Sequence, residues 1–490
     1  MPLPCADRRT RIAGRLRIRA GAAIIVALFL SGCATVARDG TAQVPFAVPA
    51  AWSAGGGAAP GTNPVAQWWR RFNDPLLGGL IDEAMRANTS VTAAQAALRQ
   101  ARALRDVAAA ALLPGVTGSG SGRHGTAGGK STGNAFNAGL DASWELDLFG
   151  ANRSAFEASE FDARASAATL ADTQVSIAAE TALSYITLRA SQARFAIASS
   201  SLATQLETLQ ITQWRLQAGL VTEVEAEQAR TSAEQTRAQL PALQTAIEQA
   251  RNAIAVLVSR PPGELAVMLA SPAPVPQASD DLALSLPAET LRQRPDVRAS
   301  EYQVTAAAAR VAQADAARLP NFKLGGSLGL SALTLGSLAT GEAVISSLLA
   351  SVSLPVFDAG AGSARVRAQE AALDKAQSAY VGTVLGALRD VENALVALRG
   401  DRERLARLRE AADAAANAAR LARQRYASGL VDFQVVLETQ RTELSTQDSV
   451  ASAGADVGSD HVRLYKALGG GWVPEPGEAL RPALYRPPAQ

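Results

Sequence analysis

The chain has 490 residues, and its 47 lysines and arginines nearly balance its 45 aspartates and glutamates, for a formal net charge of +2. This balance excludes the strongly basic surface that nucleic-acid-binding proteins present to phosphates, and we expect no nucleic-acid partner. The chain contains only two cysteines and two histidines. Neither His124 nor His461 has a second ligand at metal spacing, so no metal site is expected.

The N-terminus has the pattern of a bacterial secretory signal. Arginines crowd residues 8–19, and the apolar run AGAAIIVALFL (20–30) follows, too short to span a bilayer. The run ends in Leu30-Ser31-Gly32-Cys33, which resembles a lipobox, where the cysteine becomes the lipid-modified first residue. We predict a lipoprotein signal peptide at 1–32 and an acylated extended segment at 33–67. Under a plain secretory signal or an uncleaved anchor, Cys33 would be an ordinary residue.

Lipidation would leave the mature chain without a disulfide, because Cys5 is removed and Cys33 is acylated. An exported chain without disulfides depends on packing or assembly for its stability. Ala34 follows the cysteine, where an aspartate would favour retention in the inner membrane in enteric-type sorting. No later apolar run reaches about 18 residues, so a membrane crossing would require strands.

Residues 150–219 predict one continuous helix, since no glycine or proline lies between these two glycines. At about 1.5 Å per residue it would be on the order of 100 Å long. A coiled-coil seam is indicated by large apolar residues at seven-residue spacing, with Leu206 between them: Leu188, Phe195, Leu202, Leu209 and Leu216.

The same plan occurs twice along the chain. Leu113-Pro114 and Leu319-Pro320 each close an Ala-rich helical stretch, and Phe149-Gly150 and Phe357-Asp358 are each expected to open a long helix. The stretch 215–231 aligns with 425–442. We predict two homologous repeats, 68–258 and 288–468, each with a helix, a strand pair, a long helix, a turn and a returning helix. A proline-rich linker (259–287) joins them, and 469–490 forms a tail.

Alternating segments predict a strand pair at about 114–149 and another at about 320–355. A period of two puts apolar side chains on one face and polar ones on the other. Half-buried strands of soluble proteins also alternate, but segments of this length suit an oblique membrane crossing. Four strands cannot close a barrel, so several chains would contribute. The apolar set of the second strand is Phe136, Ala138, Leu140, Ala142, Trp144, Leu146 and Leu148.

Several stretches resemble TolC-like outer-membrane efflux proteins, specifically the lipoprotein branch that serves resistance-nodulation-division (RND) pumps. They are WWRRFNDPLLGGLIDEAMRAN (68–88), WELDLFG (144–150), RPPGEL (260–265), LRQRPDVRASE (291–301), the two GLV turns and LYKALGGGW (464–472). The resemblance implies a mostly α fold with a transmembrane β element. In that fold, a homotrimer shares a 12-stranded outer-membrane β-barrel, with four strands per protomer, which continues as a long periplasmic α-helical barrel.

The implied function is a passive exit duct for drugs or other small toxic compounds in the outer membrane of a Gram-negative bacterium. Its partners would be a periplasmic membrane-fusion adaptor, an inner-membrane RND-type transporter and outer-membrane lipid. No phosphate loop or HExxH motif occurs, so we expect no enzyme activity, and no cofactor beyond the lipid on Cys33. Two alternatives stay open: the outlet of a type I secretion system, and a structural periplasmic coiled-coil lipoprotein, which would not need four alternating segments.

The resemblance places adaptor contacts at the periplasmic tips, which contain the two glycine turns. Glycine reverses the chain without steric cost, so a simple helix hairpin would explain the same sequence. The candidate contacts are Gly219, Leu220, Val221, Gly429, Leu430 and Val431.

The resemblance also predicts a gate. In the family, an acid six positions past the first tip glycine helps close the periplasmic aperture, and here that residue is Glu225. Six past Gly429 is Val435, so the nearest acid of the second half is Asp432. Arg215 and Arg425 are further gate candidates, although charges on helices are commonly only solvated.

In the second strand, the resemblance places the acids toward a water-filled lumen and the apolar residues toward lipid. The lumen acids would be Asp141, Glu145 and Asp147. Trp144 would lie at the level of the lipid headgroups, or would simply pack in the barrel wall.

Overall fold

The computed structural model describes residues 41–52, 65–126, 132–278, 290–291, 293–339 and 344–472, all within one compact unit, Gly40–Gln490. The predicted signal peptide, Cys33 and most of the predicted tail lie outside the described residues. Within the described ranges, every helix lacks the combination of length and apolar character that a bilayer span requires.

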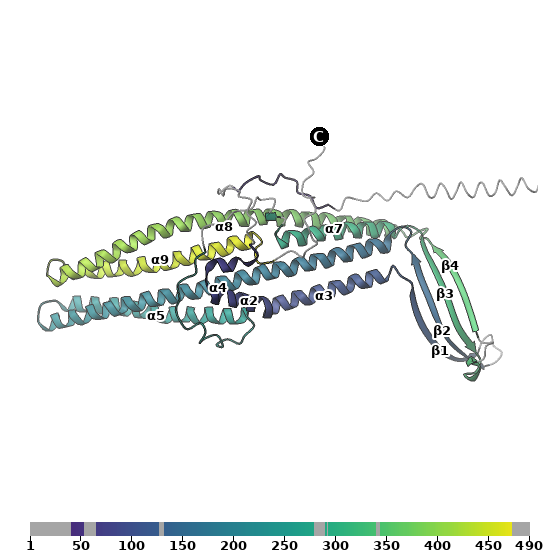
Figure 1. Ribbon diagram of the computed structural model, residues 1–490, viewed down its shortest axis with the longest axis horizontal. Coiled ribbons are helices and arrows are strands. Elements are labelled where there is room, and N and C mark those ends of the chain that lie inside the picture. The colour runs from purple at the N-terminus through teal and green to yellow at the C-terminus, as the bar shows by residue number, and fades with distance from the viewer. Residues whose placement is uncertain are drawn as a thin grey trace, which may run out of the picture. The chain divides into compact units, whose positions relative to one another are not determined.

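The first half follows the predicted order of a helical start, two strands, a long helix and a returning helix (Figure 1). Its elements are η1 (Val65–Phe72), α2 (Pro75–Ala87), α3 (Thr89–Ala110), β1 (Gly115–Thr126), β2 (Thr132–Leu146), α4 (Ala151–Gln217) and α5 (Glu223–Leu257). The second half contains α7 (Pro295–Ala316), β3 (Asn321–Ala332), η2 (Gly336–Ala339), β4 (Val344–Ser353), α8 (Ala361–Ala427) and α9 (Phe433–Ala467).

The two halves agree in length as well as in order. α4 and α8 each have 67 residues, α5 and α9 each have 35, and α3 and α7 each have 22. α8 and α9 begin 210 positions after α4 and α5. The prediction of two internal structural repeats is therefore confirmed.

Both long helices begin after a glycine in the left-handed region, Gly150 with φ 82° and Gly360 with φ 86°. The prediction that Phe357-Asp358 opens the second helix is wrong by three residues. The Asp358 carboxylate instead accepts hydrogen bonds from the backbone N–H groups of Gly360 and Gly362 at 2.9 and 2.6 Å. It therefore satisfies N–H groups that a helix start leaves unpaired.

The predicted seam of α4 faces neighbouring helices. Leu188 and Leu202 are buried, Phe195 packs against the largest core cluster, and Leu209 packs against a cluster around Phe433 of α9. The seven-residue spacing thus marks the packed side of the helix, because a period near 3.5 keeps one stripe of side chains toward its partners.

The largest core cluster lies where η1 and α2 meet α4, α5 and α9. Trp68 stacks on Tyr465, with ring centroids 5.3 Å apart. Asp74 caps α2 by accepting hydrogen bonds from two backbone N–H groups of its first turn. The other carboxylate oxygen of Asp74 accepts a hydrogen bond from the Tyr185 hydroxyl at 2.7 Å. The WWRRFNDP stretch therefore ties the start of the first half to α4 and to the last helix.

The linker between the halves is described as far as residue 278 and is partly buried. Leu265 and Leu269 are 1% and 0% exposed, and the Gln277 side-chain amide donates a hydrogen bond to the Gly454 carbonyl of α9 at 2.9 Å. It is therefore more than a surface connection, because its leucines complete the same core cluster.

The four strands form one antiparallel sheet in the order β1-β2-β3-β4. The sheet lies at the end of α4 and α8 opposite the two hairpin turns (Figure 1). Leu140 of β2 pairs with Gly118 of β1 and Leu328 of β3, and Trp144 pairs with Leu324. Since directly paired residues share a face, the apolar side chains of the two halves lie together.

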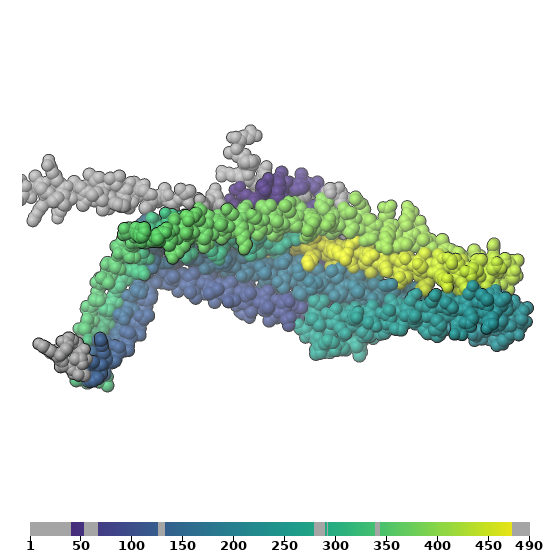
Figure 2. All heavy atoms as spheres, turned by 180° about the vertical axis from the view of Figure 1, so that it is seen from behind, coloured from purple at the N-terminus to yellow at the C-terminus, as the bar shows by residue number. Residues whose placement is uncertain are grey.

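Residues 41–52 lie against the surface of α8, where Figure 2 shows them in purple over green. Ala42 belongs to the buried cluster around Tyr380, and Trp52 belongs to a second cluster farther along α8. The Gln377 side-chain amide donates a hydrogen bond to the Gln43 carbonyl. This segment therefore follows α8 in the direction of the hairpin turn.

Candidate functional site

The α4–α5 and α8–α9 turns share one backbone geometry. Gly219 and Gly429 have φ of 70° and 72°, the left-handed conformation expected for these reversals. The N–H of Leu220 donates to the Arg215 carbonyl at 2.8 Å, and the equivalent bond in the second turn measures 2.9 Å. This is the Schellman motif, which satisfies the last carbonyls of a helix at a glycine.

The apolar residues predicted to contact an adaptor are accessible at these turns. Leu220 is 74% exposed and Leu430 is 73% exposed, while Val221 and Val431 are partly exposed. The turn geometry requires the glycines alone. The two exposed leucines are therefore free to contact a partner.

Apolar packing joins the two hairpins just below the turns. One buried cluster draws residues from α5, α8 and α9, and Leu209 of α4 and Tyr426 of α8 pack against it. The two tips therefore rest on a shared core whose buried members are Ala229, Ala422, Phe433, Val436 and Leu437.

The two acidic gate candidates have different surroundings. The Glu225 carboxylate accepts hydrogen bonds from the backbone N–H of Thr222 at 2.8 Å and from its hydroxyl at 3.3 Å. This is a capping box at the start of α5. Asp432 is the N-cap residue of α9, but its side chain makes no capping hydrogen bond. The structure does not bring the two acids into contact with each other.

Arg215 reaches from the first hairpin to the second. Its guanidinium carbon lies 4.6 Å from the ring centroid of Tyr426, and its Nη2 donates to the Ala427 carbonyl at 3.5 Å. For Arg425, the equivalent residue, the described part of the chain offers no side-chain partner. Sequence reasoning named both arginines but missed Tyr426. The available signal was an aromatic residue three positions before the second tip glycine.

The two faces of β1, β2 and β3 differ as the alternation predicted, whereas β4 places the exposed Ile345 and Leu349 on the polar face. On the apolar face, Leu140, Leu328 and Leu348 are each more than half exposed. On the other face, the Ser119 hydroxyl donates to Asp141 at 3.2 Å, and Lys323 Nζ lies 3.9 Å from Glu145. Such a sheet suits a boundary between hydrocarbon on one side and water on the other.

Asp147 does not lie on this sheet. β2 ends at Leu146, and the Asp147 carboxylate accepts hydrogen bonds from the backbone N–H groups of Asn152 at 3.2 Å and Arg153 at 2.8 Å. It therefore caps α4 instead of facing a lumen from a strand, because the first N–H groups of a helix need acceptors. The residue alternation continues to Leu148, but strand pairing does not.

Trp144 has a polar partner at the edge of the sheet. Its indole N–H donates to the carbonyl of Leu112 at 3.1 Å, while the ring is 36% exposed. The side chain therefore ties β2 to the connection between α3 and β1.

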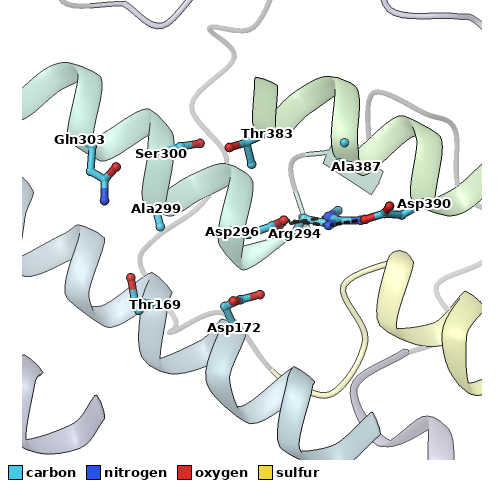
Figure 3. Close-up of a pocket in the computed structure, with 11 residues that line it drawn as sticks. Thr169, Asp172, Arg294, Asp296, Ala299, Ser300, Gln303, Thr383, Ala387 and Asp390 are labelled. Carbon is cyan, nitrogen blue, oxygen red and sulfur yellow. Dashed lines mark hydrogen bonds and ion pairs between the residues drawn. The ribbon is translucent and has the colours of Figure 1, made fainter. Parts of the chain in front are cut away.

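The LRQRPDVRASE stretch forms a charged joint between helices, drawn in Figure 3. Arg294, the N-cap residue of α7, contacts the Asp296 carboxylate at 3.0 and 2.7 Å and the Asp390 carboxylate of α8 at 3.5 Å. It also donates to the Ala467 carbonyl at the end of α9 at 3.0 Å. One largely buried guanidinium therefore connects three helices of the second half.

A cavity of about 450 Å³ adjoins this joint, between α4, α7 and α8. Asp172 of α4 lines it, facing Arg294 and Asp296 (Figure 3). Burial raises the pKa of Asp172, and the charge of Asp296 adds to the rise, while Lys466 and Arg294 oppose it. In the described ranges, no cluster of three or more His, Cys, Asp or Glu side chains could hold a metal ion.

The family described as outer membrane efflux protein matches residues 80–259 and 286–470 of the chain. The chain belongs to this family. The two matched stretches correspond to the two structural repeats, and the prediction of a TolC-like efflux protein is confirmed.

Individual relatives match this efflux protein over almost its whole length. The toluene efflux pump outer membrane protein TtgC of Pseudomonas putida is 30% identical over 481 residues, which cover 95% of this chain and 98% of that protein. The pyoverdine export outer membrane protein OpmQ of Pseudomonas putida is 31% identical over 440 residues, covering 87% and 93%. The solved outer-membrane channel OprN is 35% identical with a TM-score of 0.81, covering 88% and 99%.

The efflux protein is therefore an outer-membrane channel that serves as an exit duct for exported compounds. Its family is a channel family rather than an enzyme family. Its location is the outer membrane of a Gram-negative bacterium.

Proposed function

We propose that the efflux protein acts as a homotrimer and forms the last part of a three-part pump. A periplasmic membrane-fusion adaptor meets its two hairpin tips, and an inner-membrane RND-type transporter supplies the energy. The duct itself is passive and conducts drugs or other small toxic compounds. One observation carries this proposal: a single chain leaves the edges of its sheet unpaired and one side of α3 uncovered in the part that the structure describes.

The sheet has two edges without a partner strand in the described part of the chain. β1 pairs with β2 alone and β4 pairs with β3 alone. Backbone N–H and C=O groups at a sheet edge in a membrane need hydrogen-bond partners. Pairing β4 of one copy with β1 of the next satisfies both edges. Three copies then give a closed barrel of about 12 strands, wide enough for a polar interior.

The helices point to the same assembly through their repeat symmetry. α7 packs against both α4 and α8, whereas its counterpart α3 packs mainly against α4. Leu104 and Val107 of α3 are 58% and 68% exposed. If α3 occupies the same kind of position as α7, its free side faces an α8 from another copy. The ring of helices therefore closes only between chains.

A lipid anchor on Cys33 fits the path of the N-terminal segment. Ala42 packs in the cluster around Tyr380, which lies about 28 Å along α8 from Ala361, at the end near the sheet. The residues between Cys33 and Ala42 can span about 30 Å when extended. Cys33 can therefore reach the level of the sheet, where an acyl chain would enter the membrane.

The proposed cargo is a broad class of small toxic compounds. One relative is named for toluene efflux and another for pyoverdine export, so similar chains are named for different exported compounds. A wide, water-filled duct needs no specific binding pocket, which is consistent with this range.

Electron microscopy of the full-length protein in detergent, averaged without imposed symmetry, tests the proposal. We expect a hollow cylinder of three-fold symmetry, with a helical tube on the order of 100 Å below a detergent belt. A thin solid rod without a belt would contradict it. That result would favour a coiled-coil spacer whose sheet packs against protein.

A further inference from the structure

The two hairpin tips share one backbone geometry but carry opposite charge. Over equivalent stretches of equal length, residues 205–232 contain more acids than arginines, and residues 415–442 contain more arginines than acids. The first stretch has Glu207, Arg215, Glu223, Glu225, Glu227 and Arg230. The second has Arg420, Arg423, Arg425, Asp432, Glu438 and Arg441. The two tips therefore have the same turn geometry, but the first has a net negative charge and the second a net positive charge.

Contacts within the protein satisfy only some of these charges. Glu225 caps α5, Arg215 lies over Tyr426, and Arg230 pairs with Glu227 at 3.3 Å. Glu223 is exposed on the first tip and Arg425 on the second. Among the described residues, no ion pair joins one tip to the other. The charge left over therefore faces solvent.

A groove of about 410 Å³ runs between the two hairpins beside the tips. Its α5 wall presents Glu223 and Glu227 around Val224, which is 63% exposed. Arg441 of α9 lines the other wall. A partner helix in this groove would meet an apolar residue flanked by carboxylates on one side and a guanidinium on the other.

We propose that charge selects the adaptor and fixes its rotation on the duct. The adaptor segment at the first hairpin is basic, and the segment at the second hairpin is acidic. In a trimer, the six tips alternate between net negative and net positive charge. A partner rotated about the trimer axis by one tip position would place like charges together, which strongly disfavours association. The inference rests on the proposed trimer and adaptor, and it adds the charge pattern by which they recognise each other.

Charge reversal in the cell tests this and does not require the adaptor to be identified. The first-tip variant carries Glu207→Lys, Glu223→Lys and Glu227→Lys. The second-tip variant carries Arg420→Glu, Arg425→Glu and Arg441→Glu. The swapped variant carries all six substitutions. Each replaces the native gene, and the readout is tolerance of the compound to which deletion of the gene sensitises the cell most.

We expect each single-tip variant to fall to the tolerance of the deletion strain, because the six tips then carry one sign. We expect the swapped variant to recover most of the wild-type tolerance, because the alternation returns with a shift of one tip. Full activity of both single-tip variants would overturn the proposal. So would a swapped variant that assembles normally but stays at the level of the deletion strain.

A matched control changes the same charge away from the tips. Glu180→Lys, Glu403→Lys and Glu410→Lys alter exposed acids on the shafts of α4 and α8, and we expect wild-type tolerance. A fall equal to that of the first-tip variant would show that net charge, not tip charge, matters.

The bilayer conductance of the purified variants separates partner recognition from contacts between the hairpins. We expect the single-tip variants to conduct as the wild type does in the absence of any adaptor. A conductance that rises in the single-tip variants and returns in the swapped variant would assign the charges to gate closure and overturn the proposal. If deletion of the gene leaves every tolerance unchanged, the proposed pump function fails instead.

Discussion

The guanidinium of Arg215 lies over the ring of Tyr426, 4.6 Å from its centroid, and links the end of α4 to the end of α8. A cation–π contact near the surface contributes about 0.5–1 kcal/mol. The link therefore holds the two hairpins together at the tip with a strength that a partner could overcome.

Arg215→Ala should raise the open fraction of the channel about two- to fivefold, because the link between the hairpins is lost. Single-channel conductance in planar bilayers measures this. Arg425→Ala is the matched control and should conduct as the wild type does. An unchanged Arg215→Ala channel would exclude the link from gating.

Gly219→Pro should cut efflux while trimers still form. Proline cannot adopt the positive φ of this turn, and it removes the N–H that donates to the Leu216 carbonyl at 2.9 Å. The strain is confined to the tip, far from the sheet. Efflux assays and native gels measure the two effects. The control is Gly400→Ala inside α8, which should leave the stability of the protein unchanged or raise it by about 0.5–1 kcal/mol. Unchanged efflux in Gly219→Pro would show that the tip has no role in transport.

Arg294→Ala should destabilise the protein by about 1.5–3 kcal/mol, because it removes the charge-assisted contacts of a largely buried guanidinium with the partly buried Asp296 and Asp390 carboxylates. Burial acts to lower the pKa of Arg294, but Asp296, Asp390 and Asp172 raise it overall, so the side chain stays charged. Arg294→Lys should recover only part of the loss, since lysine lacks the planar fork.

The thermal unfolding midpoint of the purified protein reports this loss. The control is Arg389→Ala, because Arg389 is 70% exposed and pairs with Asp390 at 2.9 Å. Exposed pairs of this kind contribute at most about 1 kcal/mol. Equal shifts in Arg294→Ala and Arg389→Ala would show that the joint between the helices has no special role.

Asp460→Asn should flatten the pH dependence of stability. Burial raises the pKa of Asp460, Arg463 acts to lower it, and a hydrogen bond with Asp401 raises it further above the ordinary value of 3.8. The folded state then holds this proton more tightly than the unfolded state. The stabilisation is complete below the ordinary pKa and is lost as the pH rises through the folded pKa.

Unfolding midpoints measured from about pH 4 to pH 8 would reveal this contribution. The wild type should lose stability across the lower part of that range more steeply than Asp460→Asn. Asp413→Asn, at an exposed site on α8, should follow the wild-type curve. The same slope in wild type and Asp460→Asn would assign the pH dependence to other groups.

Cys33→Ala should weaken membrane attachment without abolishing it, since the sheet of the assembled trimer would still hold the protein in the membrane. Mass spectrometry of the N-terminal peptide should show an acylated Cys33 in the wild type, and alkaline extraction of membranes should release more of the variant. Complete loss of insertion in the variant would show that the sheet is not the main anchor.

Local spacing in the amino-acid sequence is enough to predict several features of this protein. Glycine is the residue that adopts positive φ without steric cost, so Gly219 and Gly429 mark the two reversals. The period of two between Phe136 and Leu146 assigns side chains to the faces of β2 whichever strands pair with it. The two repeats follow from matching stretches such as 215–231 and 425–442.

Features that join distant parts of the chain depend on how the helices and strands pack against each other. The alternation continues past Leu146, but pairing with β3 stops there, and Asp147 becomes a helix cap. Arg215 meets Tyr426, and Arg294 meets Asp390, because helices far apart in sequence pack side by side. Periodicity tells which side of an element is covered, but not which residue of another element covers it. That choice is made by packing between elements, and no local pattern encodes it.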